Sequence, residues 1–225
     1  EKLVKKAGRK THQQTLEKLT SIENGRRRII TDPPLLVPFR EMGLERYLDP
    51  EDLQHATEQV VKNSWSQYLA SLPDERRFLL NQFQITDAAL RVGGVGSVGT
   101  RCVIVLLESR SEGDALILQL KEAGPSVLEA HVAHQVTVSS AHRVVTAQRM
   151  MQATSDIFLG WHTDQLSGRD YYWRQLKDMK GSVDVAGMDF ESMKSYMGVC
   201  AWCLSRAHAR TGDETGIAGY IGKND

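Results

Sequence analysis

Four glycines within seven residues separate two apolar stretches near the middle of the chain. Gly94, Gly96 and Gly99 have the spacing G-x-G-x-x-G, and Gly93 adds a fourth glycine. Ser97 supplies a hydroxyl group inside the same turn. Glycines permit positive φ and let backbone N–H groups approach a phosphate closely. Two classes of nucleotide-binding protein share this spacing, and a flexible hairpin loop is a third interpretation. The residues after the loop decide among them.

The segment after the loop is rich in β-branched residues. Residues 102–107 read Cys-Val-Ile-Val-Leu-Leu, which is typical of a buried strand. A dinucleotide-binding fold instead needs a helix that begins at the last glycine and faces the pyrophosphate. The sequence therefore favours a loop between two strands, as in the glycine-rich loop of protein kinases. A dinucleotide-binding oxidoreductase remains an alternative, which a strand directly after the loop would exclude.

A lysine ends the next predicted strand. Residues 116–121 form a third apolar run and end at Lys121, which is 22 residues after Gly99. The short connections predict that the three strands are antiparallel. A lysine at this place resembles the kinase lysine that contacts the α- and β-phosphates. The alternative is an ordinary strand-end lysine that reaches solvent.

A kinase-type lysine is held in place by a carboxylate. Glu129 is the first candidate for this partner, and Gln148 in the following predicted helix is a polar alternative. Glu122 is adjacent in sequence but should point to the opposite face of the strand. At the end of a later strand, a hinge is predicted near Leu176 and Lys177. Its backbone N–H and C=O groups would face the edge of an adenine.

The remaining segments complete an α+β fold. Periodicity predicts helices at residues 8–20, 49–72, 125–135, 140–154 and 189–209, a strand at 171–177, and an extended proline-containing segment at 24–40. We expect a protein-kinase-like small lobe, an antiparallel sheet plus a helix, at residues 83–180. Residues 181–225 would begin a helical lobe, and residues 1–82 would form a helical connecting region.

Several stretches jointly resemble a bacterial family catalogued as domain of unknown function number 2252. They lie at residues 94–101, 118–123, 143–152, 156–161, 174–180 and 207–213, so the resemblance covers nearly the whole chain. It implies a kinase-like protein. Family members carry a catalytic-loop-like segment and an acidic strand before the glycine loop, which implies a circularly permuted order. This chain lacks both segments. The resemblance thus implies the ATP-binding region of a phosphotransferase, inactive as this fragment, or a non-catalytic pseudokinase-like interaction module.

Composition narrows the expected partners. Lys plus Arg and Asp plus Glu balance at 28 each, so nothing in the net charge favours nucleic acid or an anionic membrane. No apolar run approaches the roughly 20 residues of a membrane helix. Three cysteines and the lack of an apolar leader favour the cytoplasm. We expect ATP as the nucleotide, Mg²⁺ with ligands outside this chain, no catalytic or metal-binding residue within it, and an unidentified phosphate acceptor.

Overall fold

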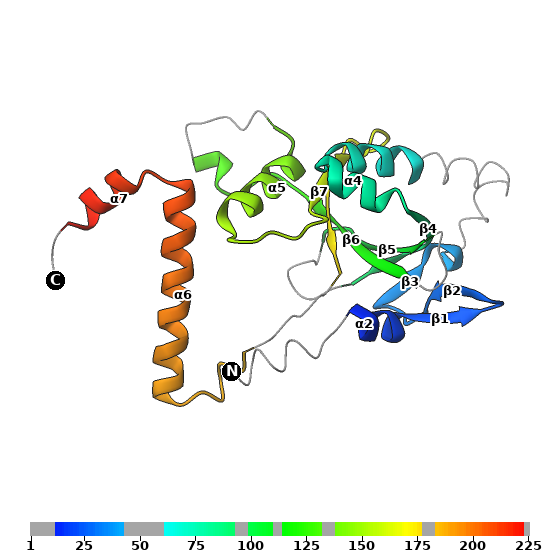
Figure 1. The fold of residues 1–225 in the computed structure, drawn as a ribbon, viewed down its shortest axis with the longest axis horizontal. Helices are drawn as coiled ribbons and strands as arrows, with labels where there is room; N and C mark the ends of the chain where they lie inside the picture. Colours follow the sequence, from blue (N-terminus) through cyan, green and yellow to red (C-terminus); the bar gives the residue numbers. More distant parts are fainter. Residues whose placement is uncertain are drawn as a thin grey trace.

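A six-stranded antiparallel sheet forms the centre of the computed structural model, which describes residues 12–42, 61–92, 99–109, 114–131, 138–176 and 183–222. The strand order is β3-β4-β5-β6-β8-β7. Figure 1 labels all of these strands except β8. The strands of this sheet are β3 (Leu36–Pro38), β4 (Phe83–Arg91), β5 (Cys102–Ser109), β6 (Ala115–Ala123), β7 (Gly160–Thr163) and β8 (Asp170–Gln175). A separate hairpin pairs β1 (Thr20–Glu23) with β2 (Arg26–Ile29). The mixed α+β class predicted from the sequence is confirmed.

The described residues also form helices. They are α2 (His12–Leu19), α4 (Asp74–Leu80), α5 (Ser140–Met151), α6 (Phe190–Thr211), α7 (Glu214–Ile221), the 3₁₀ turns η1 (Phe39–Glu41) and η4 (Glu129–His131), and a helical segment over residues 61–70. Capping side chains mark the starts of two predicted helices. Ser139 accepts a hydrogen bond from the His142 N–H at the start of α5, and Asp189 accepts one from the Ser192 N–H at the start of α6. Within the described ranges, no helix combines the length and apolarity needed to cross a bilayer.

Each face of the sheet has its own apolar core, because successive residues of a strand point to opposite sides. The first face packs against the helical segment 61–70 and α4, and its buried core consists of Tyr68, Leu72, Leu80, Val105, Leu107, Leu116, Leu118, Phe158 and Trp173. The second face packs against α2 and β2, and its buried core consists of Leu16, Ile29, Leu36, Ala89, Ile104, Leu106, Ile117 and Leu176. The central strands β5 and β6 are therefore buried on both sides.

The N-terminal region contains more strand than its sequence predicts. The helix predicted at residues 8–20 ends at Leu19, and the chain then enters the β1–β2 hairpin. Asn24 and Gly25 form its turn with φ values of 50° and 77°, a pairing that hairpin turns favour. The predicted extended segment at 24–40 is confirmed, since it includes β2 and β3. Of the helix predicted at 49–72, residues 49–60 lie outside the described residues.

Two further segments differ from expectation. The described part of the helix predicted at 125–135 contains a single 3₁₀ turn, in which Glu129 accepts a hydrogen bond from the Ser126 N–H at 2.8 Å. Strand β7 was not predicted. It contains Gly160, where an added Cβ would lie 2.6 Å from Ser71 Oγ and 2.7 Å from the Tyr68 ring. The close approach of β7 to these residues therefore requires a glycine.

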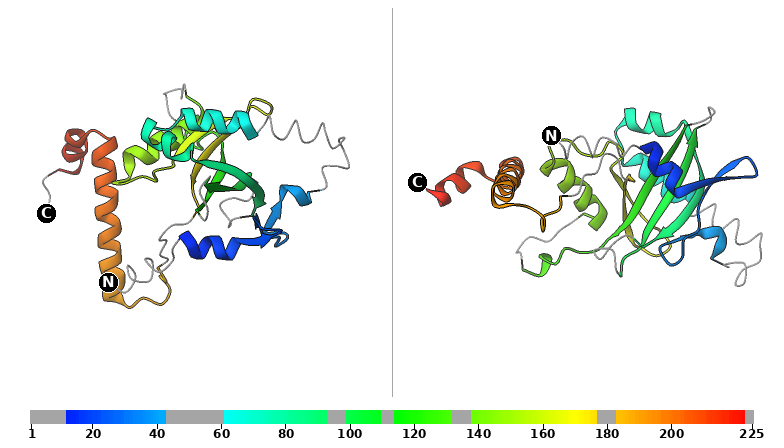
Figure 2. Two further views of the ribbon diagram at one scale, coloured as in Figure 1. Left: turned by 45° about the vertical axis from the view of Figure 1, so that its right-hand side comes forward. Right: turned by 90° about the horizontal axis from the view of Figure 1, so that it is seen from below.

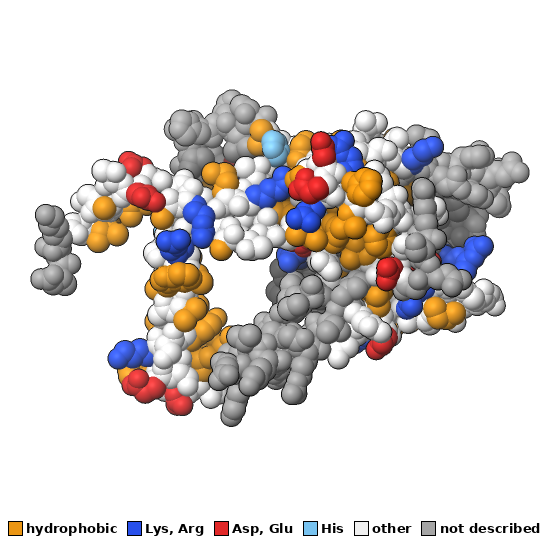
Figure 3. All heavy atoms as spheres, viewed as in Figure 1, with side chains coloured by type: hydrophobic (Ala, Val, Ile, Leu, Met, Phe, Trp, Pro, Cys, Tyr) orange, Lys and Arg blue, Asp and Glu red, His pale blue; other side chains and the backbone are white. Residues whose placement is uncertain are grey.

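Helix α6 stands apart from the sheet and meets the rest of the fold through α5 (Figures 1 and 2). Its start and extent confirm the helix predicted at 189–209. The apolar side chains along it are largely exposed, as the hydrophobic atoms on α6 in Figure 3 show. Phe190, Met197 and Leu204 are 76%, 62% and 56% exposed. The apolar side chains whose spacing predicted α6 therefore form an exposed surface of the helix and are not buried in a core.

Candidate functional site

The last glycine of the predicted phosphate loop leads directly into a strand. Gly94, Gly96 and Ser97 lie outside the described residues, whereas Gly99 is described and has a φ of 82°. This value lies in the region that favours glycine. Strand β5 begins at Cys102 and pairs with β4 in antiparallel fashion. The dinucleotide-binding alternative required a helix that begins at Gly99, and the observed strand excludes it.

Lys121 lies beside the strand that leaves the glycine loop. Its neighbours in the sheet are Cys102 on β5 and Tyr172 on β8. Tyr172 in turn pairs with Trp161 on β7. Paired residues of an antiparallel sheet project to the same side, so this row of four side chains lies on the second face. The Lys121 ammonium group forms no hydrogen bond or ion pair with another described residue.

The next row on the second face adds another cation. Gln119 lies between Ile104 and Arg174. Gln119 is 7% exposed, and its Nε2 donates to Cys102 Sγ at 3.1 Å. The Arg174 Nε is buried and has no acceptor among the described residues. Buried donors normally have a partner. Arg174 is therefore a second positive group on this face that can take an anionic acceptor.

Helix α5 covers the second face next to these rows. The His142 ring stacks on Trp161, with 4.8 Å between ring centroids. Val145 is buried, and Gln148 lies one turn further along the same side of the helix. Burial raises the pKa of the Tyr172 phenol above its ordinary value of 10. The Tyr172 hydroxyl therefore stays protonated at neutral pH and is a hydrogen-bond donor.

Glu129 does not serve as the partner of Lys121 in this structure. Its Oε1 lies 3.5 Å from the Arg143 Nε, and the same oxygen accepts from the Ser126 N–H. Glu129 lies on η4, before α5 begins. Of the two partners considered from the sequence, Gln148 is the one carried by α5.

Glu122 points away from Lys121, as the strand alternation predicted. It pairs with Tyr171, a residue of the first face. Its carboxylate lies 3.3 Å from Arg101 Nη1 and 2.8 Å from Arg169 Nη1. Burial raises the pKa of Glu122, but hydrogen bonds from the Arg101 N–H and the two guanidinium groups outweigh it, and the pKa is lowered. Glu122 is a paired carboxylate at the rim of the first face.

The predicted hinge is described only at its first residue. Leu176 is 2% exposed and belongs to the core of the second face. Its N–H donates to the Ile117 carbonyl at 3.0 Å, so that N–H is already used within the sheet. Lys177 lies outside the described residues.

Gln119, Tyr172 and Arg174 were not predicted as site residues from the sequence. All three lie in segments correctly predicted as strands. Alternation along each strand places Tyr172 and Arg174 on one side. Which side faces Lys121 depends on the register between β6 and β8, and 46 residues lie between Ala123, the last residue of β6, and Asp170, the first of β8. That register is a tertiary property with no local sequence pattern.

The comparison with protein families agrees with the resemblance seen in the sequence. A family model described as "Uncharacterized protein conserved in bacteria (DUF2252)" matches residues 1–225. The chain belongs to this family. A search of curated proteins and a search of solved structures found no match. The description of DUF2252 gives no activity, so the function of this member must be argued from its own residues.

Proposed function

We propose that this DUF2252 protein binds ATP between its glycine-rich loop and the second face of the sheet, as the kinase-like nucleotide-binding region of a phosphotransferase. One observation carries the proposal. Lys121 lies directly opposite Cys102, three residues after Gly99. A lysine in this position can reach the phosphates that the loop glycines would cover.

The order of elements supports the same proposal. Two antiparallel strands flank the glycine loop, a third carries the lysine, and the following helix, α5, packs on the lysine-bearing face. Protein kinases use a glycine loop, a lysine on the third strand and a following helix in these roles. We also propose the circularly permuted order of segments that the family resemblance implies. It would assign the chemical step to a segment that precedes the glycine loop.

The charges on the second face suit a polyphosphate. Lys121 supplies a compact positive charge, and the guanidinium of Arg174 supplies several donors in a fixed geometry. The two rows that contain them hold no carboxylate: their other members are Cys102, Trp161, Tyr172, Ile104 and Gln119. Gln148 is neutral, so it would leave the charge of Lys121 uncompensated. A bound phosphate would then be the natural counter-ion.

A kinase-like site implies Mg²⁺ together with ATP. Within the described ranges, no three His, Cys, Asp or Glu side chains gather closely enough to hold a metal ion. We propose that the described residues bind the nucleotide and that Mg²⁺ enters as the ion that accompanies ATP.

The test is calorimetric titration of ATP·Mg²⁺ into the wild-type chain, Lys121→Ala and Lys194→Ala. Lys194 is an exposed lysine on α6 and controls for the loss of one positive charge. A charge-assisted hydrogen bond contributes about 1.5–3 kcal/mol, so Lys121→Ala should weaken ATP binding by roughly tenfold or more. Lys194→Ala should bind like the wild type. Equal affinity of all three proteins would reject the role of Lys121, and no binding by the wild type would reject the function.

A non-catalytic interaction module is the second candidate function. The exposed apolar side chains of α6, including Phe190, Met197 and Trp202, favour it, because such surfaces commonly bind other proteins. This candidate predicts a folded protein that transfers no phosphate, even when the family's upstream segments are present. Measurable release of phosphate from ATP by such a protein, abolished by Lys121→Ala, would reject it.

A further inference from the structure

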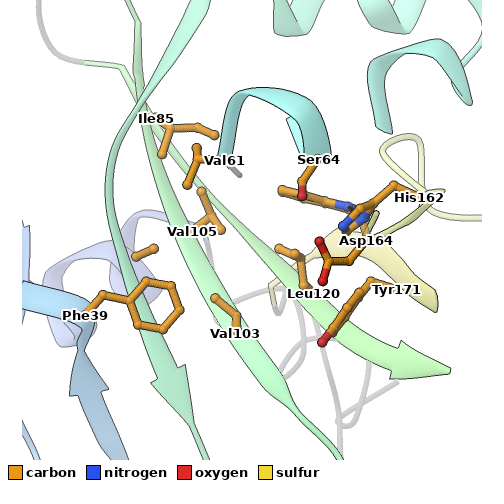
Figure 4. Close-up of a pocket in the computed structure, with 12 residues that line it drawn as sticks. Phe39, Val61, Ser64, Ile85, Val103, Val105, Leu120, His162, Asp164 and Tyr171 are labelled. Carbon is orange, nitrogen blue, oxygen red and sulfur yellow. Dashed lines mark hydrogen bonds between the residues drawn. The ribbon is translucent and has the colours of Figure 1, made fainter. Parts of the chain in front are cut away.

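A cavity of about 160 Å³ lies on the first face of the sheet, opposite the face that carries Lys121. Its two ends differ in chemistry (Figure 4). The ring of Phe39 and the side chains of Val103 and Val105 line the apolar end. Ser64, His162, Asp164 and Tyr171 line the other end, and the cavity surface as a whole is almost entirely apolar. An apolar cavity with a few polar groups at one end is the usual form of a small-molecule site.

His162 is a neutral hydrogen-bonding group at the polar end. Its Nδ1 accepts a hydrogen bond from the Trp173 Nε1–H at 2.8 Å. The indole nitrogen can only donate, so the imidazole must carry its proton on Nε2. Burial lowers the pKa of His162 to about 4, and the ring is uncharged at neutral pH. His162 therefore brings no positive charge to the cavity.

Asp164 is the charged group of the cavity. Burial raises its pKa, but hydrogen bonds from the Ser167 hydroxyl and N–H outweigh this effect, and the pKa is lowered below 3.8. The carboxylate is ionised at neutral pH. The described residues that line the cavity include no Lys or Arg. The cavity thus carries one negative charge and has no cation in its lining to balance it.

We propose that this cavity binds a small aromatic amine, with its ring against the apolar wall and its ammonium group at Asp164. A cavity of about 150 Å³ can hold one benzene ring, so the volume suits a single ring with a short chain. The ammonium group would form charge-assisted hydrogen bonds to the carboxylate. The adjacent rings of Tyr171 and Trp173 also favour a cation. A ligand with a carboxylate in the same place would be repelled.

The amine site is separate from the proposed ATP site. Leu120 lines the cavity, whereas the next residue, Lys121, projects to the second face. Neighbouring residues of a strand point to opposite sides. Failure of ATP binding would therefore leave the amine proposal intact, and the converse also holds.

The experiment compares two probes of the same shape and opposite charge. Phenethylamine and 3-phenylpropionate are titrated into the wild-type chain, and binding is followed by NMR chemical shifts of the tryptophan indole N–H groups. We expect saturable binding of phenethylamine near Trp173 and at least tenfold weaker binding of 3-phenylpropionate. Equal affinities for the two probes, or no binding of the amine at millimolar concentrations, would overturn the proposal, and this test needs only the wild-type chain.

Variants then locate the site. Asp164→Asn keeps an acceptor for Ser167 but removes the charge, and should weaken phenethylamine binding about tenfold. The matched control is Asp184→Asn, since Asp184 also accepts a hydrogen bond within a turn, from the Gly187 N–H, but lies outside the cavity lining. Val103→Phe should fill the cavity and abolish binding. Unchanged affinity in both Asp164→Asn and a folded Val103→Phe would place the amine elsewhere and refute the proposal.

Discussion

Acidification from pH 7 to pH 5 should destabilise the fold through His162. This residue is 2% exposed and is held by the hydrogen bond from the Trp173 indole and by stacking on Tyr171 at 5.3 Å between centroids. Burial lowers its pKa from 6.5 to about 4. The unfolded chain therefore binds a proton on this residue before the folded chain does. The contribution of His162 to the free energy of unfolding is therefore fully present above about pH 6.5 and is lost as the pH falls toward 4.

The size of the effect follows from the shift in pKa. A difference of one pKa unit corresponds to about 1.36 kcal/mol, so the shift from 6.5 to about 4 limits the total loss to roughly 3 kcal/mol. Between pH 7 and pH 5, linkage gives a loss of about 2 kcal/mol. The carboxyl groups of Glu122 and Asp164 act in a lower range. Their lowered pKa values add stability that is lost only as the pH falls below their ordinary values of 4.5 and 3.8.

The assay is urea unfolding at pH 7, 6 and 5 of the wild type and of His162→Asn. The asparagine Oδ1 can take the place of Nδ1 as the acceptor for the Trp173 indole, and it does not titrate in this range. The wild type should lose about 2 kcal/mol more than His162→Asn between pH 7 and pH 5. All other histidines contribute equally to both proteins and cancel in the difference. Parallel pH profiles for the two proteins would refute the reasoning.

Two further substitutions probe the packing of β7 on the helical segment 61–70. Gly160→Ala should lower the free energy of unfolding by about 1–3 kcal/mol, because its Cβ would overlap the Tyr68 ring. Urea unfolding measures this loss, and a stability equal to that of the wild type would show that β7 can move away from the ring. Tyr68→Phe should lower the free energy of unfolding by about 1–2 kcal/mol, because the Phe158 carbonyl would lose the hydroxyl that donates to it at 2.8 Å. Thermal unfolding would measure this loss, and an unchanged midpoint would mean that water replaces the hydroxyl.

Local patterns were sufficient to predict the strands around the glycine loop. The β-branched residues after Gly99 and the short turns that join the strands require an antiparallel arrangement, and the structure has it. Helices α5 and α6 were predicted for the same reason, since helical periodicity is a local pattern. Glu122 was correctly placed on the face opposite Lys121, because alternation along a strand does not depend on tertiary structure.

Pairings between residues that are far apart in the sequence could not be predicted from local patterns. Strand β7 has only four residues, and its conformation depends on pairing with β8 and on contact of Gly160 with Tyr68, 92 residues earlier. The pairing expected for Glu129 was wrong for a related reason. Arg143, at the start of α5, lies close enough to take this carboxylate, and no pattern in the sequence ranks Arg143 above Lys121 as its partner. The cavity residues His162 and Asp164 were missed because β7 itself was missed.

The register of β6 determines which chemistry each face of the sheet can have. Because side chains alternate, a shift of one residue would exchange Leu120 and Lys121 between the faces and would place a charge inside the apolar cavity. The apolar residues of β6 do not oppose such a shift, because Ile117 and Leu118 are both fully buried, on opposite faces, and would only exchange places. The shift would instead move the buried amide of Gln119 from the second face into the apolar core of the first. The hydrogen bond from Gln119 to Cys102 adds a polar link between β6 and β5 on the second face. The polar side chains of Gln119 and Lys121, rather than the two apolar cores, thus fix the register that keeps the positive charge of Lys121 on one side of the sheet and the negative charge of Asp164 on the other.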